Sequence, residues 1–162
     1  MRYFLIDRVL ELECDKKIVA IKNVSLSEDV FNDHFFGNPV MPGALQIEAI
    51  AQAATVLIEV SSRLTKKAVP IIIHGAKFRE LVIPGDQMRL TLEVISSDGH
   101  TTQLDAIVSV NDKVVTSAKM TFSLQPIDKF YPQSARHMVI LLYRNFLKGA
   151  KLTGVELPGE EP

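Results

Sequence analysis

His34 and Glu48 are the two side chains of this 162-residue chain whose types and surroundings best fit proton-transfer chemistry. His34 stands before the turn signals Gly-Asn-Pro at 37–39 and Pro-Gly at 42–43, so we expect it on a loop. Glu48 stands among Ala and Ile residues, where burying an unpaired carboxylate is expensive. A functional site explains this mixture better than ordinary core sequence does.

Loss of water from a β-hydroxyacyl thioester is a reaction that these residues could perform. It needs a base for the α-proton, an acid for the leaving hydroxyl and a hydrogen-bond donor for the enolate-like oxygen. If a helix begins at Pro42 and Gly43, its first backbone N–H groups lack partners within the helix and can stabilise negative charge. Gly43 would also let a substrate approach the backbone closely.

Each of these residues also has a simpler explanation. A histidine such as His34 is often hydrogen-bonded within a loop without further function, and a buried salt bridge could account for Glu48. Gln52, one helical turn after Glu48, either holds that carboxylate in place or is an ordinary helix glutamine. From the residues alone, these alternatives stay open.

A helix from Ala44 to about Arg63 is predicted to carry Glu48, because the segment is rich in Ala, Ile, Leu, Gln and Glu and contains no Gly or Pro. Its first part is apolar almost all round, which is typical of a helix wrapped by other elements. Its polar residues recur at a spacing that places them on one face, so we expect that face to look towards something polar. They are Glu48, Gln52, Thr55 and Glu59.

Runs rich in β-forming residues lie on both sides of this helix in the sequence. Short turn sequences such as Pro-Gly-Asp at 84–86 and Ser-Asp-Gly at 97–99 separate the later runs, which predicts an antiparallel meander. One long buried helix with a sheet curled round it belongs to the α+β class. The predicted strands are 3–13, 17–25, 69–78, 87–95, 101–110 and 113–124, and 26–43 is predicted to be a loop.

The bulk properties exclude several classes of function. A net charge of −1 and a pI near 6.4 provide no overall basic field for nucleic acid. Cys14 is the only cysteine, and no His/Cys cluster has the spacing of a zinc site, so we expect neither an intramolecular disulfide nor a metal. No apolar run reaches the roughly 20 residues of a transmembrane span, and a cytoplasmic protein is expected.

Three ordered segments of the chain resemble the FabZ-type (3R)-hydroxyacyl-[acyl-carrier-protein] dehydratases. The resemblance covers roughly residues 3–124, and Phe36 stands where the family usually has proline. The matching segments are the signature HFFGNPVMPG at 34–43 with EAIAQAA at 48–54, the second landmark KFR at 77–79 with VIPGDQM at 82–88, and the N-terminal strand YFLIDRV at 3–9.

The resemblance implies a hotdog fold, in which an antiparallel sheet wraps a central helix. It also implies a homodimer, possibly assembled further into a trimer of dimers, whose active sites combine the His of one subunit with the Glu of the other. Carried over by position, His34 is the base, Glu48 the acid and Gly43 the backbone donor to the thioester carbonyl. Gln52 orients Glu48, and the backbone carbonyl near Val40 fixes the His34 ring.

The implied reaction is the dehydration of (3R)-hydroxyacyl-carrier-protein thioesters to trans-2-enoyl thioesters, in fatty acid or related acyl-chain biosynthesis and without a metal or organic cofactor. The partner is an acyl carrier protein that presents the acyl group on phosphopantetheine. Lys77, Arg79 and Arg89 are candidates for docking it, although they could equally form a solvated strand face. A hotdog thioesterase and a non-catalytic acyl-thioester-binding subunit of a synthase complex remain alternatives.

The resemblance says nothing about residues 125–162. We therefore expect a dehydratase domain at 1–124 and an extension at 125–162, with a helix from about Ala135 to Lys148 and a flexible acidic tail from Glu156 to Pro162. The basic, apolar helix could contact another subunit, the carrier protein or a membrane surface. Packing on its own subunit is the simplest expectation.

Overall fold

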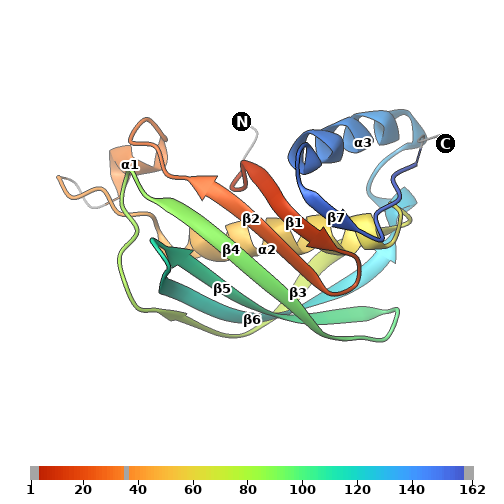
Figure 1. Ribbon diagram of the computed structural model, residues 1–162, viewed down its shortest axis with the longest axis horizontal. Coiled ribbons are helices and arrows are strands. Elements are labelled where there is room, and N and C mark those ends of the chain that lie inside the picture. Colours follow the sequence, from red (N-terminus) through yellow and green to blue (C-terminus); the bar gives the residue numbers. More distant parts are fainter. Residues whose placement is uncertain (1–3, 35–36, 159–162) are drawn as a thin grey trace.

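One long helix, α2 (Gly43–Ser61), is wrapped by a single curved sheet in the computed structural model, which describes residues 4–34 and 37–158 (Figure 1). Across the sheet the strand order of the described residues is β3-β6-β5-β4-β2-β1-β7. All neighbours are antiparallel except β1 and β7. This confirms the predicted α+β hotdog architecture. The strands are β1 (Arg8–Glu13), β2 (Lys17–Asn23), β3 (Lys66–Phe78), β4 (Gln87–Ser97), β5 (Thr101–Val110), β6 (Lys113–Pro126) and β7 (Lys151–Thr153).

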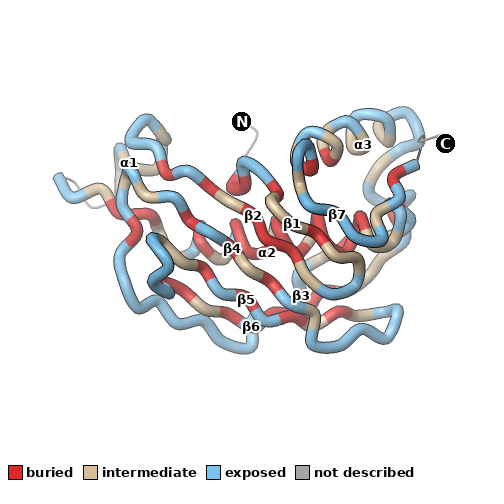
Figure 2. Tube along the Cα trace, in the orientation of Figure 1, coloured by how far each residue is buried: buried red, intermediate tan, exposed pale blue. Residues whose placement is uncertain are grey.

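The core lies between α2 and the inner face of the sheet, as the buried segments in Figure 2 show. Ile50 and Leu57 of α2 are fully enclosed and share one cluster with Leu90, Leu92 and Phe122 of the sheet. Each such side chain contributes about 1.5–3 kcal/mol through burial. By composition α2 could also span a membrane, but 61% of that stretch is buried inside the protein, as in the core helix of a globular domain.

Alternation along the strands determines which side chains face α2. In β4 and β5, buried positions alternate with exposed or half-buried ones over most of each strand, because successive side chains point to opposite faces of a sheet. Asn111 and Asp112 join β5 to β6 with φ angles of 48° and 64°. Two consecutive positive φ values are typical of a type I′ hairpin turn, whose twist matches the twist of the strands.

The chain after β6 folds back over α2 and β1. It forms the short helix η1 (Ile127–Lys129), the helix α3 (Gln133–Leu147) and β7, which adds to β1 as a parallel strand. Tyr143 and Leu147 are buried, so α3 packs on its own subunit (Figure 1). α3 overlaps the helix expected at 135–148, whereas β7 was missed because three residues carry no readable pattern. Part of the predicted flexible tail, 159–162, lies outside the described residues.

Glu59 lies on the polar face of α2 and does look towards polar groups, as expected, but these groups enclose it rather than leave it open. Its side chain is fully buried and forms an ion pair with Lys67, whose Nζ lies 2.7 Å from Glu59 Oε1. The Tyr143 hydroxyl of α3 donates to the other carboxylate oxygen of Glu59. Lys67 Nζ donates to the Tyr131 hydroxyl at 3.0 Å. These contacts connect α2, β3 and the C-terminal extension.

The charges of this cluster are set by burial and by mutual contact. Burial alone lowers the pKa of Lys67, but the charge and hydrogen bond of Glu59 and the Tyr131 hydroxyl outweigh burial, so the pKa of Lys67 is raised. Burial, followed by the neighbouring Glu59 charge, raises the pKa of Tyr143 well above its usual value of 10.0. At neutral pH the cluster therefore holds a Lys67 cation and an intact Tyr143 hydroxyl.

Replacing Lys67 with Met should lower the free energy of unfolding by about 3–5 kcal/mol, because the Glu59 carboxylate would stay buried without its cation. Urea denaturation measures the loss. Lys66→Met is the matched control, since the Lys66 ammonium donates to the Gly99 carbonyl oxygen at the surface. Its loss should lower the free energy of unfolding by about 1 kcal/mol or less. Equal losses in the two variants would contradict this account of Lys67.

The same cluster should weaken in alkaline solution. A group whose pKa is higher in the folded protein contributes stability that is complete below its unfolded pKa and is lost as the pH rises through its folded value. Lys67 and Tyr143 both have raised pKa values, so we expect the melting temperature to fall above about pH 10. Thermal melts of the Tyr143→Phe variant should show a smaller fall, and an unchanged fall would rule out a contribution from Tyr143.

Candidate active site

Buried hydrogen bonds hold the start of α2 in place. Gln46, which is only 3% exposed, donates from Nε2 to the Met41 carbonyl at 3.2 Å and accepts from Thr116 Oγ1 at 2.5 Å. The Met41 N–H donates to the Val82 carbonyl at 2.7 Å. These bonds tie the segment before α2 to β6 and to the β3–β4 connection. Gln46 was not among the predicted site residues, because nothing in the sequence distinguishes it from other helix glutamines.

Gly43, the first residue of α2, packs against the aromatic ring of Phe78. A Cβ added at Gly43 would lie 2.9 Å from two ring carbons of Phe78, closer than real Cβ contacts come. The N–H groups of Leu45 and Gln46 donate to the Pro42 carbonyl. Helix geometry gives the N–H groups of Gly43 and the residue after it no acceptor within the helix, so they are candidates to donate to a ligand.

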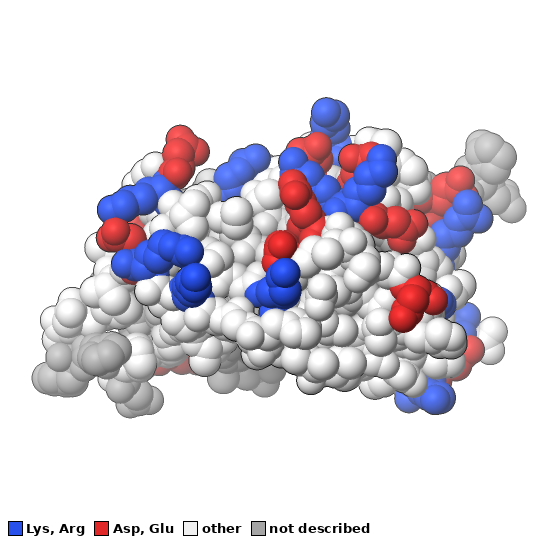
Figure 3. Space-filling model, turned by 90° about the horizontal axis from the view of Figure 1, so that it is seen from below, with Lys and Arg blue, Asp and Glu red and all other residues white. Residues whose placement is uncertain are grey.

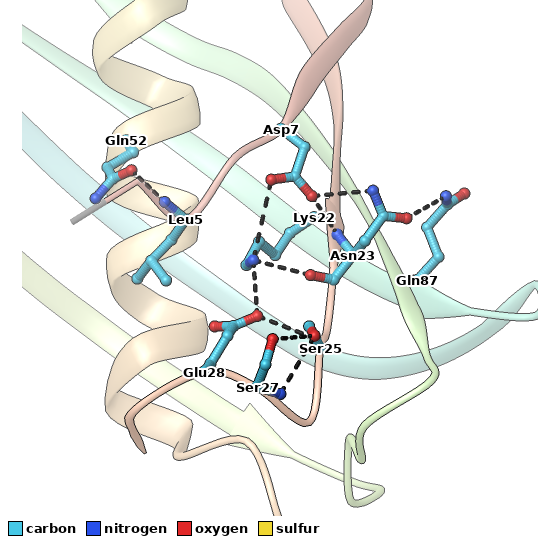
Figure 4. Close-up of polar contacts among 9 residues, drawn as sticks. All are labelled: Leu5, Asp7, Lys22, Asn23, Ser25, Ser27, Glu28, Gln52 and Gln87. Carbon is cyan, nitrogen blue, oxygen red and sulfur yellow. Dashed lines mark hydrogen bonds and ion pairs between the residues drawn. The ribbon is translucent and has the colours of Figure 1, made fainter. Parts of the chain in front are cut away.

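Glu48 lies on the second turn of α2 and is exposed in the single chain. We expected it to be buried among Ala and Ile, but those residues occupy the other faces of the helix, which the sheet covers. Gln52 Nε2 donates to Glu48 Oε1 at 3.0 Å. Gln52 Oε1 accepts from the Leu5 N–H at 2.8 Å, as Figure 4 shows. Gln52 thus links the Glu48 carboxylate to the N-terminal segment.

His34 is half-buried and directly follows α1 (Val30–Asp33), a one-turn helix in a stretch predicted to be a loop. Phe36, the departure from the family pattern, lies outside the described residues. Val40, whose carbonyl was expected near the His34 ring, is buried beside the start of α2. His34 and Glu48 therefore stand on either side of the helix start in the chain.

A second polar network fastens the segment that leads to α1 and His34 (Figure 4). The buried Lys22 ammonium at the end of β2 donates to Glu28 Oε1 at 2.9 Å and to the Asn23 carbonyl at 2.8 Å. Glu28 Oε1 also accepts from the Ser25 N–H at 3.1 Å. The turn before α1 is therefore anchored to the sheet, which limits the positions that His34 can take.

The face of α2 that carries Glu48 lines a groove of about 320 Å³. The N-terminal segment, the start of β3 and α3 form its other sides. The described residues contain no group of three His, Cys, Asp or Glu that could hold a metal ion. The groove is lined by Phe4, Ile6, Glu48, Ala51, Gln52, Thr55, Val56, Lys67, Ala68, Pro70, Tyr131, Leu142, Tyr143 and Phe146.

The three basic residues considered for carrier docking are exposed but do not form one cluster. Lys77 lies near the end of β3, and Arg79 follows it and donates from Nη1 to Ser117 Oγ at 2.9 Å. Arg89 lies on β4, so β6 and β5 separate it from β3 by about 14 Å across the sheet. Figure 3 shows basic and acidic side chains interspersed on the face that it presents.

Solved structures with low sequence identity share this fold. A Streptococcus mutans protein bound to acetyl CoA aligns with a TM-score of 0.62 at 16% identity and covers 78% of this chain and 94% of its own. The dehydratase heterocomplex ApeI:P from Xenorhabdus doucetiae aligns with a TM-score of 0.56 at 18% identity, over 68% and 89% of the two chains. The shared fold places this chain among the hotdog proteins.

Sequence relatives narrow this class. The profile of the FabA-like domain matches residues 1–119. The 3-hydroxyacyl-[acyl-carrier-protein] dehydratase FabZ of Pediococcus pentosaceus is 45% identical over 124 residues, which cover 76% of this chain and 83% of the relative. FabZ of Symbiobacterium thermophilum is 40% identical over 136 residues, 83% and 94% of the two chains. The chain belongs to the FabA-like family and, within it, to the FabZ-type dehydratases.

A side chain at position 43 should have to displace the half-exposed Phe78 ring. Gly43→Ala is expected to lower the free energy of unfolding by about 1–3 kcal/mol through overpacking. In the Gly43→Ala, Phe78→Ala double variant the ring is gone, so urea denaturation should show a smaller loss than the sum of the two single losses, by at least about 0.5 kcal/mol. Additive losses would mean that the ring does not restrict position 43.

Proposed function

We propose that this chain removes water from (3R)-hydroxyacyl thioesters of acyl carrier protein and yields trans-2-enoyl thioesters, with His34 as the base and Glu48 as the acid. The observation that carries the proposal is the hydrogen-bonded chain from Leu5 through Gln52 to Glu48 on the exposed face of α2. A carboxylate held in this way, in a chain of the FabZ type, supports the assignment of Glu48 as the proton donor.

The proposed reaction divides the work among three groups. The His34 imidazole takes the α-proton, and the electron pair moves towards the thioester carbonyl oxygen. The Gly43 N–H at the start of α2 donates to that oxygen as it becomes negative, an interaction worth about 10²–10³ in rate in other enzymes. Glu48 protonates the β-hydroxyl, which leaves as water while the double bond forms. The Gln46 contacts that fix the helix start serve this geometry.

A second copy of the chain is part of the proposal, because β3 is an edge strand. It pairs only with β6 among the described strands, and its residues from Pro70 to Phe78 are all exposed. Ile71, Ile72 and Ile73 are each about half exposed, a pattern that invites pairing with another strand. Antiparallel pairing of two β3 strands would join the sheets and bring His34 of one subunit towards the exposed Glu48 of the other.

The partner and the setting complete the proposal. Lys77 and Arg79, which lie close together, are the better candidates for contacting the acidic carrier protein, because Arg89 lies three strands away. We place the protein in the cytoplasm, in acyl-chain biosynthesis, and a trimer of such dimers is the larger assembly that gel filtration with light scattering would detect.

Mixing two inactive variants tests both the roles and the shared site. His34→Ala and Glu48→Gln should each abolish the formation of enoyl thioester, which is followed by its ultraviolet absorbance. If each site takes its His and Glu from different subunits, a coexpressed mixture should regain about a quarter of the wild-type activity, because half of the dimers are mixed and each contains one intact site.

Two results would contradict the proposal. Normal turnover in either single variant would remove that residue from the mechanism, and no recovery in the mixture would place His34 and Glu48 of one site in the same subunit. Free thiol is measured in the same reactions. Thiol released without enoyl product would identify a thioesterase instead.

A further inference from the structure

The groove along α2 extends well beyond the residues assigned to proton transfer. Glu48 and Gln52 lie near one end, and Thr55 lines the groove further along α2. The buried Glu59 does not line it, but is bonded to Lys67 and Tyr143, which do. Glu59 lies eleven positions after Glu48, which corresponds to about 16 Å of helix. More than half of the lining residues are apolar, namely Phe4, Ile6, Ala51, Val56, Ala68, Pro70, Leu142 and Phe146.

The C-terminal extension forms one wall of this groove. Leu142, Tyr143 and Phe146 of α3 line it, and the Phe146 ring packs edge-on against Phe4, with centroids 5.8 Å apart. All three residues lie beyond residue 119, where the match to the FabA-like domain ends. The wall therefore lies outside the stretch that matches the family model.

The far end of the groove is polar and already satisfied. Lys67 and Tyr143 line it there, and both are bonded to the buried Glu59 carboxylate. A hydrocarbon tail that reached this cluster would disturb an ion pair that is shielded from water, which is unfavourable. The apolar stretch is thus open at Glu48 and closed at Lys67.

We propose that this groove holds the distal part of the substrate acyl chain and that Leu142 and Phe146 of the extension determine which chain lengths the enzyme prefers. The inference rests on the proposed function, since the reacting carbons must lie beside Glu48, and a chain leaving them along α2 enters the groove directly. Each methylene buried there favours binding about fourfold. Medium-length chains that end before Lys67 gain most.

Chain-length profiles of designed variants test the proposal. Phe146→Ala removes part of the wall, and Thr55→Phe fills the middle of the groove with a ring on the half-exposed face of α2. In both, the ratio of kcat/KM for 3-hydroxydecanoyl over 3-hydroxybutyryl carrier protein should fall about tenfold, mainly through KM. Met138→Ala is the matched control, because Met138 lies on α3 but is 59% exposed and away from the groove.

Binding of products provides a readout that does not depend on turnover. Calorimetry compares trans-2-decenoyl pantetheine with crotonyl pantetheine, and Phe146→Ala and Thr55→Phe should weaken only the longer one, about tenfold. The inference is overturned if Phe146→Ala and Thr55→Phe keep the kcat/KM ratio and the ratio of the two binding affinities that wild type and Met138→Ala show. If the wild type binds decenoyl pantetheine through Phe146 but dehydrates no substrate, the proposed function fails while the acyl groove stands.

Discussion

Enclosure of α2 by the curved sheet is the constraint on which the rest of the structure depends. Ile50, Leu57 and their neighbours fill the inside of the curved sheet, so α2 cannot rotate or slide. Its polar face must then point away from the sheet. Gln46 then fixes the position of the first turn of α2 through its hydrogen bonds to Met41 and Thr116. The N–H groups of the first turn and the carboxylate of the second turn are therefore presented from one rigid element, as a catalytic site requires.

The C-terminal extension makes the two halves of the polar face of α2 different. Tyr143 and Lys67 cover and neutralise Glu59, whereas Glu48 is exposed and its carboxylate accepts a hydrogen bond from Gln52. The desolvation cost of a buried ion pair offsets most of the attraction between its charges, so the pair adds little net stability. It acts mainly to define how α3 docks. The docking of α3 in turn creates the wall of the groove beside the exposed half.

The second copy proposed above would explain one further feature. An exposed edge strand with three adjacent isoleucines is a liability in a monomer, and pairing with a second copy would cover it. The network around Lys22 anchors the segment before His34, and in such a dimer it would help to position that histidine against the neighbouring subunit.

Sequence by itself determined the main elements and the candidate residues. Period-two alternation gave the strands, the unbroken apolar segment gave α2, and the ordered motifs around His34 and Glu48 gave the family. Sequence could not show that Glu59 is buried while Glu48 is exposed, since both lie on one helix face with similar neighbours. Periodicity reports which residues share a face, but only tertiary structure decides what covers that face. Here Lys67 of the next strand and Tyr143, which is 84 residues away in the sequence, made the difference.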